Sequence, residues 1–388
     1  MDTTPDLPAA RAAAPSLVRA RVAVSMAFFV CGCGVGLWAV HIPLVAERLA
    51  IGAGTIGLAL LSAAIGAVGT MPLTGFTLAT YGSRLPTAAI VIAFAILAPL
   101  PILSPTVPFL FVALFLFGAA MGALDVAMNT QAAEIEAARG RPTMSSFHGF
   151  FSVGALAGAI LGGFIVGVGW GNGSGAVLAA VALLAMAVWS AMNLWPSGRP
   201  VDGGPRFALP PIAVLGLGAI TFLAFSGEGG VVDWSALYLS TVKLSTTAEA
   251  ASGLAAFSVT MVVFRLTGDW LVARIGNVAT IVGGGLLMAA GMIVAVAAPW
   301  PWVVAAGFGI VGIGTANLVP VAFSAATRVP GVPPGLGVAA VTTTGYGGFL
   351  IFPPVLGFVG EAWGLSVSLL VVAVMGLAIA GFAGAVRR

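Results

Sequence analysis

Charged side chains are scarce in this chain of 388 residues. Asp, Glu, Lys and Arg together make up 7% of it, whereas a typical soluble domain contains about 25%. Hydrophobic residues make up 60%, and the mean hydropathy is +1.12. Because so few charges cannot cover the surface of a soluble globular domain, the composition predicts an integral membrane protein.

Cysteine and histidine are also rare, with two of each. Cys31 and Cys33 are two residues apart in an apolar segment, where a helix turns them to different faces. We therefore expect neither a disulfide nor a metal site there. The sequence offers no metal-ligand cluster and no nucleophile–base pair, which argues against an enzyme and against a cofactor.

Basic residues slightly outnumber acidic ones, 15 to 12, and the pI is about 9.3. They are spread along loops rather than gathered in a patch, which argues against a nucleic-acid partner. If the N-terminus lies inside, all 15 except Arg48 and Lys243 fall on the cytoplasmic side, as the positive-inside rule requires. The sequence thus predicts a multi-pass protein of a bacterial inner membrane with both termini in the cytoplasm.

Apolar segments long enough to cross a bilayer follow one another along the chain. The first, after Arg21, is longer than a signal-peptide core and lacks a cleavage site, so we interpret it as a retained transmembrane helix. We predict an all-α membrane protein with twelve transmembrane helices and short loops. The expected ranges are 21–46, 52–79, 86–103, 107–136, 143–169, 174–195, 208–240, 248–273, 277–298, 301–327, 335–360 and 363–385.

The longest polar connection divides the predicted helices into two groups of six. The pairs Trp38/Trp234 and Gly82/Gly276 recur at nearly the same offset, which supports two related halves. We predict a disordered cytoplasmic tail (1–18), an N-terminal six-helix half (19–195), a cytoplasmic linker (196–207) and a C-terminal six-helix half (208–388).

Five stretches carry a resemblance to a known family. Residues 75–84 and 268–276 are similar to the cytoplasmic loop motif of the major facilitator superfamily. Residues 123–131, 144–152 and 227–238 resemble its MosC-like or YbjJ-like branch and, more distantly, the fucose/proton symporter branch. The resemblance implies two six-helix halves related by pseudo-two-fold symmetry, with the substrate site between them. It also implies a secondary transporter, in a branch associated with rhizopine, an aminated inositol derivative.

A carboxylate in the fourth predicted helix is the first candidate for chemistry. Placing an acid in hydrocarbon costs about 2.5 to 3.5 kcal/mol, so such residues usually face a cavity or a partner. Asn129 lies one helical turn after Asp125 on the same face, and His148 lies at a similar depth in the fifth helix. We expect Asp125 and His148 to couple protons and Asp125 and Asn129 to bind substrate. The alternative is that they only order the packing of the two helices.

Two further acids lie in the seventh predicted helix, among three glycines that would let the helix bend or unwind. We expect Glu228 to couple protons and bind substrate; alternatively, it only bridges helices. Asp233 is a candidate for substrate binding and for a gate with His41 in the first helix, where the alternative is an interfacial histidine without a switching role.

Aromatic and polar residues near these acids complete the predicted substrate site. Flat rings can stack on a sugar or cyclitol or hold a cation, although Trp and Tyr near span ends also serve as interfacial anchors. Asn317 and Thr343 are candidates for a polar wall, or for hydrogen bonds within the bundle. The ring candidates are Trp38, Phe150, Trp234 and Tyr346.

Charges near the loops are assigned to structural roles. We expect Arg265, Asp269 and Arg274 to form an intracellular latch around the second copy of the loop motif. The hairpin between the fourth and fifth helices is predicted to have a solvated end that takes no part in chemistry. Its residues are Glu134, Glu136, Arg139 and Arg141.

Together these features predict a monomeric secondary transporter that works with a small-molecule substrate, protons and membrane lipid. The substrate is a sugar, a cyclitol or an aminated cyclitol, moved by alternating access with proton coupling as symport or antiport. The alternative is proton-driven efflux of amphipathic drugs or cations. A receptor or scaffold would more naturally carry a soluble sensing domain, and the short loops argue against it.

Overall fold

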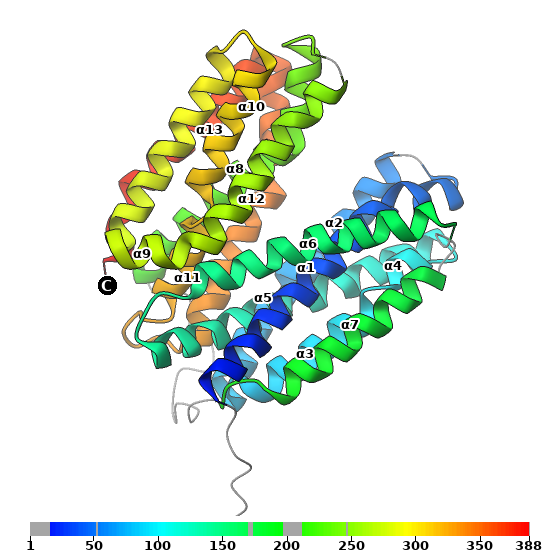
Figure 1. Cartoon of the computed structure of the whole chain (residues 1–388), viewed down its shortest axis with the longest axis vertical. Helices are drawn as coiled ribbons and strands as arrows, with labels where there is room; N and C mark the ends of the chain where they lie inside the picture. The colour runs from blue at the N-terminus through cyan, green and yellow to red at the C-terminus, as the bar shows by residue number, and fades with distance from the viewer. Residues whose placement is uncertain (1–15, 52, 170–173, 197–211, 246, 388) are drawn as a thin grey trace, which may run out of the picture.

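The computed structural model describes residues 16–51, 53–169, 174–196, 212–245 and 247–387, all of them in helices or short connections (Figure 1). The predicted tail and linker lie almost entirely outside these residues. The N-terminal half contains α1 (Leu17–Arg48), α2 (Ala53–Tyr81), α3 (Arg84–Leu97), α4 (Leu100–Leu103), α5 (Val107–Arg139), α6 (Met144–Gly167) and α7 (Ser174–Met192). The C-terminal half contains α8 (Ile212–Thr241), α9 (Thr247–Ala297), α10 (Pro301–Thr315), α11 (Leu318–Ala326), α12 (Pro334–Trp363), α13 (Leu365–Gly381) and the 3₁₀ turn Phe382–Val386.

The predicted twelve-helix architecture is confirmed. Within the described residues, eleven helices are long and apolar enough to cross a membrane. One of them, α9, has 51 residues and bends at Gly276, whose φ of 81° and ψ of 165° are not helical, so it supplies the eighth and ninth spans. Breaks within the third and tenth spans separate α3 from α4 and α10 from α11.

Local sequence accounts for where α5 begins and ends. The side chain of Thr106 accepts a hydrogen bond from the Phe109 amide (3.4 Å), and Pro108 lies in the first turn, where no backbone donor is needed. Gly140 ends the helix with a φ of 64°, a conformation that favours glycine. The next helix therefore returns after a short turn.

Small residues let neighbouring helices approach closely. A Cβ on Gly118 or Gly122 of α5 would collide with the backbone of α2, and one on Gly154 or Gly158 would collide with that of α1. This is the packing that small-xxx-small patterns allow in membranes, where van der Waals contact replaces the hydrophobic driving force. It fixes the positions of α1, α2, α5 and α6 around the centre of the half.

The two halves touch at one end of the molecule and diverge toward the other (Figure 1). Between the halves, α2 packs on α12 and α6 packs on α9. These contacts include Gly75 with Ala339 and Gly149 with Leu266. We call the closed end, where Arg139, Arg141 and Arg328 lie, the arginine-rich end; Arg48 and Lys243 lie at the opposite end.

Candidate functional site

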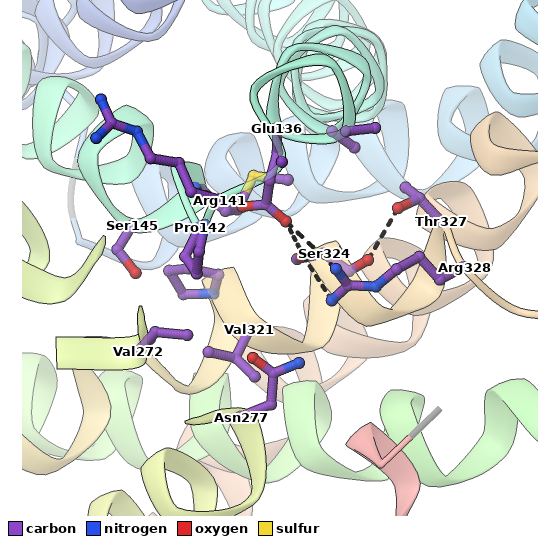
Figure 2. Close-up of a pocket in the computed structure, with 15 residues that line it drawn as sticks. Glu136, Arg141, Pro142, Ser145, Val272, Asn277, Val321, Ser324, Thr327 and Arg328 are labelled. Carbon is purple, nitrogen blue, oxygen red and sulfur yellow. Dashed lines mark hydrogen bonds and ion pairs between the residues drawn. The ribbon is translucent and has the colours of Figure 1, made fainter. Parts of the chain in front are cut away.

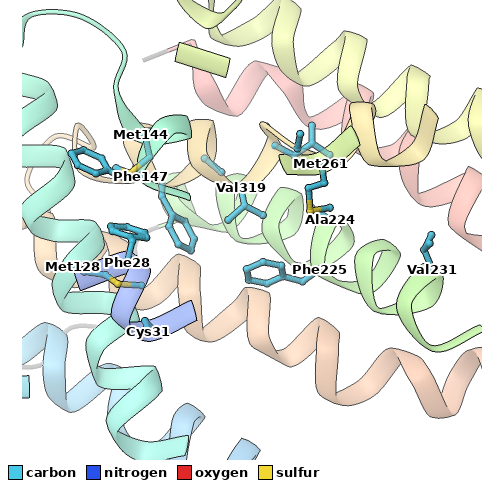
Figure 3. Packing of buried hydrophobic residues seen from close by; sticks show 14 of the residues in the cluster. Phe28, Cys31, Met128, Met144, Phe147, Ala224, Phe225, Val231, Met261 and Val319 are labelled. Carbon is cyan, nitrogen blue, oxygen red and sulfur yellow. The ribbon is translucent and has the colours of Figure 1, made fainter. Parts of the chain in front are cut away.

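A cavity of about 400 Å³ lies between the two halves. Its lining comes from α1, α2, α5 and α6 on one side and from α8, α9 and α12 on the other. Apolar side chains form most of its walls, and Figure 3 shows Phe28, Cys31 and Met128 of one half facing the side of the C-terminal half that carries Phe225. The polar groups in its lining are those of Asp125, His148, Glu228, Arg265 and Tyr346, together with the indole of Trp38 and the thiol of Cys31.

Asp125, Asn129 and His148 form one hydrogen-bonded chain beside the cavity. The Asn129 amide nitrogen donates to the Asp125 carboxylate (3.0 Å) and to the Asp125 carbonyl (2.8 Å), while Nε2 of His148 donates to Oδ1 of Asn129 (3.0 Å). All three are buried, and Asp125 is 8% exposed. The spacing and depth inferred from the sequence thus match the structure.

Aromatic rings hold the His148 imidazole in place. The Phe28 ring lies 5.3 Å away and the Phe323 ring 5.7 Å away, the latter edge-on. Phe28 belongs to the N-terminal half and Phe323 to α11 of the other half. The imidazole therefore lies at the meeting point of the two halves and faces both a polar chain and two apolar rings.

Arg265 reaches the same cavity from α9 and binds three helices. Its Nη2 lies 3.3 Å from Oε2 of Glu228 on α8, and its Nη1 donates to Oγ of Ser152 on α6 (3.0 Å). Its Nε donates to the Ala316 carbonyl (3.4 Å), which is exposed by the break between α10 and α11. The prediction that Arg265 belongs to a latch at the loop was wrong. Arg265 lies about three helical turns before Gly276, and its side chain, which is 5% exposed, reaches the cavity.

The expected unwinding around Glu228 is also absent. α8 is helical from Ile212 to Thr241, so its glycines do not expose backbone groups to the cavity. They instead admit neighbours: the Met288 side chain meets Gly227, and the Phe349 ring meets Gly229. The glycines therefore serve close packing, and Glu228 contributes its side chain alone.

Aromatic side chains supply flat surfaces to the cavity, as predicted for Trp38 and Tyr346. Tyr346 packs edge-on against Phe225 (5.6 Å) and Phe349 (6.2 Å), and these two rings stack at 4.7 Å. The prediction for Phe150 was wrong by one position. Phe151 lines the cavity, whereas Phe150 is 38% exposed and lines a groove on the outside of the N-terminal half.

Six other predicted site residues do not line this cavity: His41, Asn129, Asp233, Trp234, Asn317 and Thr343. His41 is buried, donates from Nδ1 to the Leu37 carbonyl (2.8 Å) and packs near Gly162 of α6. Asp233 is exposed on α8, and the structure does not bring it to His41. Asn317 donates to the Phe264 carbonyl (3.1 Å) at the break between α10 and α11, a hydrogen bond within the bundle.

Comparisons with known proteins assign this architecture to a family. The model for the Major Facilitator Superfamily matches residues 24–252, more than half of the chain. The chain belongs to the major facilitator superfamily. An uncharacterized MFS-type transporter of Yersinia pestis is 39% identical over 95% of this chain and 96% of its own length. Membrane protein MosC of Rhizobium meliloti is 34% identical over 92% of this chain and 88% of its own length.

Solved structures share the fold at low sequence identity. The transporter FucP in its outward conformation superposes with a TM-score of 0.81, at 17% identity, over 95% of this chain and 98% of that one. The proton:xylose symporter XylE gives 0.73 at 15% identity, with 94% of both chains covered. The resemblance stated from the sequence is therefore confirmed: this is a multi-pass membrane transporter of the superfamily, and not an enzyme.

The arginine-rich end of this major facilitator protein is closed by Glu136, a residue that was wrongly predicted to be solvated. It is 8% exposed, and its Oε2 accepts hydrogen bonds from the amides of Thr143 (2.8 Å) and Met144 (3.0 Å) at the start of α6. Its Oε1 accepts from the Ser324 hydroxyl of α11 and lies 3.8 Å from the Arg328 guanidinium (Figure 2). One carboxylate thus holds α5, α6 and α11 together.

A second contact between the halves involves Asp269, with partners that differ from those predicted for a latch. Its carboxylate accepts from the Ser146 amide (3.0 Å) and lies 4.0 Å from the Arg21 guanidinium of α1. Arg274, expected in the same latch, is exposed and lies over the Trp270 ring at 5.6 Å.

Some of the residues missed from the sequence carried a detectable signal. Arg265 is a base well inside an apolar segment, and the rule that intramembrane charges face cavities or partners applies to it as it does to Asp125. Glu136 lies at the edge of a predicted span and had no such signal. Which of Phe150 and Phe151 faces the cavity depends on helix rotation, which the local pattern of apolar residues on both faces does not define.

Proposed function

We propose that this protein is a proton-coupled secondary transporter of a small polar metabolite that works by alternating access. It sits in the bacterial inner membrane with both termini and the arginine-rich end in the cytoplasm. The observation that supports this most directly is the cavity between the halves, where Asp125 faces the Glu228–Arg265 pair. In the conformation described, contacts at the arginine-rich end close the cytoplasmic side, and the substrate enters from the opposite side.

The charges around the cavity favour a neutral or singly positive solute. Glu228 is neutralised by Arg265, whereas the Asp125 carboxylate accepts a hydrogen bond from the neutral amide of Asn129. A protonated Asp125 leaves the polar groups without net charge, which suits a sugar or cyclitol held by hydroxyl groups and stacked on Trp38 or Tyr346. An ionised Asp125 leaves one negative charge, which suits an aminated cyclitol such as a rhizopine-like compound.

The choice between symport and antiport follows from the same carboxylate. If proton and substrate bind together, a neutral polyol is imported in symport. If a cationic solute and a proton compete for Asp125, the protein exchanges one for the other. The hydrogen-bonded chain through Asn129 to His148 gives the proton a partner on α6, the helix that contacts the other half.

Proton-driven efflux of amphipathic cations is the second candidate. The apolar side chains of Leu60, Ala63, Leu114 and Phe117 form one wall of the cavity and favour a lipophilic ring system. The carboxylate of Asp125 would then bind the cationic head. This alternative predicts binding of lipophilic cations and no selectivity for the arrangement of hydroxyl groups.

The gate at the open end remains a proposal. Closing that end would bring α1 toward α8, and His41 and Asp233 lie on these helices at similar distances from their outer ends. Nε2 of His41 is buried and has no partner, so it is free to accept or donate a hydrogen bond in the closed state. A contact with Asp233 would satisfy it.

Thermal stabilisation of the purified protein tests the substrate class. The panel contains sugars, inositols, aminated cyclitols and lipophilic cations, each measured with the wild type and with Asp125→Asn and Glu228→Gln. A ligand at a hundred times its Kd adds about 2.7 kcal/mol when it binds only the folded state. Glu361→Gln is the control, because this exposed acid at the end of α12 makes the same acid-to-amide change far from the cavity.

Selective stabilisation by a cyclitol or sugar, lost in Glu228→Gln and kept in Glu361→Gln, is the expected result. Asp125→Asn, which resembles the protonated acid, should still be stabilised by a neutral ligand. Stabilisation by lipophilic cations alone would support the efflux function instead. A polar ligand that stabilises all variants equally would show that it binds elsewhere and would reject the proposed site.

A further inference from the structure

A groove of about 570 Å³ runs along the outside of the N-terminal half, separate from the transport cavity. Most of its lining comes from the first part of α1, and the rest from one residue each of α5, α6 and α7. α6 and α7 pack together near their connection, where Gly175 meets the Ile165 side chain. Toward the arginine-rich end they flank α1 on either side and leave its face uncovered (Figure 1).

The length of the groove matches one leaflet of a bilayer. Its lining extends along α1 from Leu17 to Phe29, which is about 18 Å at a rise of 1.5 Å per residue. The hydrocarbon core of a bilayer is about 30 Å thick, so one leaflet contributes about half of that. Val22, Met26 and Phe150 make the groove apolar along this length.

Two guanidinium groups, of Arg21 and Arg139, lie at the arginine-rich end of the groove. Arg21 donates to the Ser146 hydroxyl (3.1 Å) and Arg139 to the Thr143 hydroxyl (3.3 Å). Each guanidinium has five N–H donors, so both retain donors for a further acceptor. The groove therefore has an apolar body and a cationic head, the complement of an anionic lipid.

We propose that this groove binds an anionic phospholipid, with an acyl chain along α1 and the phosphate held by Arg21 and Arg139. Arginine suits this role because its planar fork matches the phosphate oxygens. The depth of the arginines agrees, because they lie at the end of α1 and α5 where headgroups begin.

The proposed site connects to the contact between the halves. Arg21 lies 4.0 Å from the Asp269 carboxylate on α9, at the limit of an ion pair. A lipid phosphate and Asp269 therefore compete for the same guanidinium. Bound anionic lipid should weaken the contact of α1 with α9 and favour opening of the arginine-rich end.

The test measures the affinity of the purified full-length chain for phosphatidylglycerol and phosphatidylcholine by native mass spectrometry. We expect tighter binding of phosphatidylglycerol. Because one basic residue near a membrane surface contributes about fivefold to the binding of anionic lipid, Arg21→Gln and Arg139→Gln should each weaken it roughly fivefold. Arg274→Gln is the matched control, since it removes an exposed arginine of the same end that lies over Trp270 and outside the groove.

Asp269→Asn gives the sharpest readout, because it should tighten phosphatidylglycerol binding at least twofold. A purely structural role of Asp269 in the latch would leave this affinity unchanged. Val22→Trp fills the groove without changing a charge and should weaken binding of both lipids.

Several results would overturn the proposal. The first is equal affinity for the two lipids. The second is an equal loss of phosphatidylglycerol affinity in Arg274→Gln and Arg139→Gln. The third is binding of inorganic phosphate, which has no acyl chain, as tightly as phosphatidylglycerol. Binding of phosphatidylglycerol only after deletion of residues 1–15 would identify that segment as the occupant and would likewise reject a lipid site.

Discussion

The two acids that face the cavity are held in opposite ways. The Asp125 carboxylate accepts from an amide of its own helix, in a chain that continues to His148 within the N-terminal half. The Glu228 carboxylate binds Arg265 of α9, and that arginine continues to Ser152 of the other half. One acid therefore has a neutral partner inside the N-terminal half. The other forms an ion pair inside the C-terminal half, and the arginine of that pair reaches across to Ser152.

This difference separates the two tasks of a coupled transporter. A carboxylate with a neutral donor can gain or lose a proton without leaving an unpaired cation behind. Protonation of Glu228 would leave Arg265 buried without its counterion, which is costly. We therefore propose that Asp125 exchanges the proton and that Arg265, held by Glu228, connects the halves.

The largest expected effect is that of Asp125→Asn, which should abolish accumulation of substrate driven by a proton gradient. The asparagine keeps the shape and can accept from Asn129, so the protein should fold and still exchange substrate for substrate. The measurement compares gradient-driven uptake with counterflow in proteoliposomes, using the ligand found by thermal stabilisation. Gradient-driven uptake that equals the wild type would remove Asp125 from the coupling mechanism.

Glu228→Gln is the matching variant for this experiment, since it changes the other acid in the same way. We expect it to lower counterflow and gradient-driven uptake together, because it disturbs the contact of Arg265 with the other half rather than the binding of the proton. If Glu228→Gln instead keeps counterflow and loses only accumulation, the roles of the two acids are exchanged.

Arg265→Gln should have the largest effect on stability. The two side chains of the pair are 6% and 19% exposed, and removing one partner of a buried pair costs about 3 kcal/mol. The free energy of unfolding in detergent is the measurement. The double variant with Glu228→Gln should recover more than half of the loss, because no unpaired charge remains.

Arg274→Gln is the control for this comparison. Its guanidinium is exposed and lies over the Trp270 ring, where a cation–π contact contributes about 0.5 to 1 kcal/mol. A loss for Arg265→Gln no larger than that of this control, or no recovery in the double variant, would show that the bridge to Glu228 does not stabilise the fold.

The sequence was sufficient for the architecture because each span is a long apolar run whose ends are marked by Gly, Pro or charge. It also located Asp125, Asn129 and His148, since a spacing of four within one helix and equal depth in a hairpin are local geometry. Arg265 was misplaced because its partners lie on other helices, with Glu228 37 residues and Ser152 113 residues away along the chain. Glu136 was missed because its partners Ser324 and Arg328 lie in the other half.

Glu136 joins the two halves directly, whereas Glu228 reaches the other half only through Arg265. Hydrogen bonds to charged groups contribute about 1.5 to 3 kcal/mol, so Glu136→Gln should weaken the closed arginine-rich end by at least about 1.5 kcal/mol, a shift of more than tenfold toward the open state. Spin labels at exposed positions of the two halves, Leu85 and Ile275, report the distance between them. The labelled distance should lengthen in a larger fraction of molecules.

Glu134→Gln provides the control on the same helix. The Glu134 carboxylate accepts from Ser83 (2.7 Å) and Gln131 (3.2 Å), both in the N-terminal half. It should change stability without changing the distance between the labels. An equal shift in both variants would mean that loss of charge at this end, rather than the bridge to α11, controls opening.

The smallest expected effect concerns the wall beside the two acids, and it rests on two consecutive residues. Successive positions on a helix point about 100° apart, so Phe151 lines the cavity while Phe150 faces the outer groove. Phe151→Ala should lower substrate affinity roughly fivefold, the effect of losing about 1 kcal/mol of aromatic contact. Phe150→Ala should leave it within twofold, as measured by thermal stabilisation at a series of ligand concentrations. The reverse order of effects would mean that α6 is rotated in the substrate-bound protein, and the assignment of cavity-facing positions on that helix would have to move by one residue.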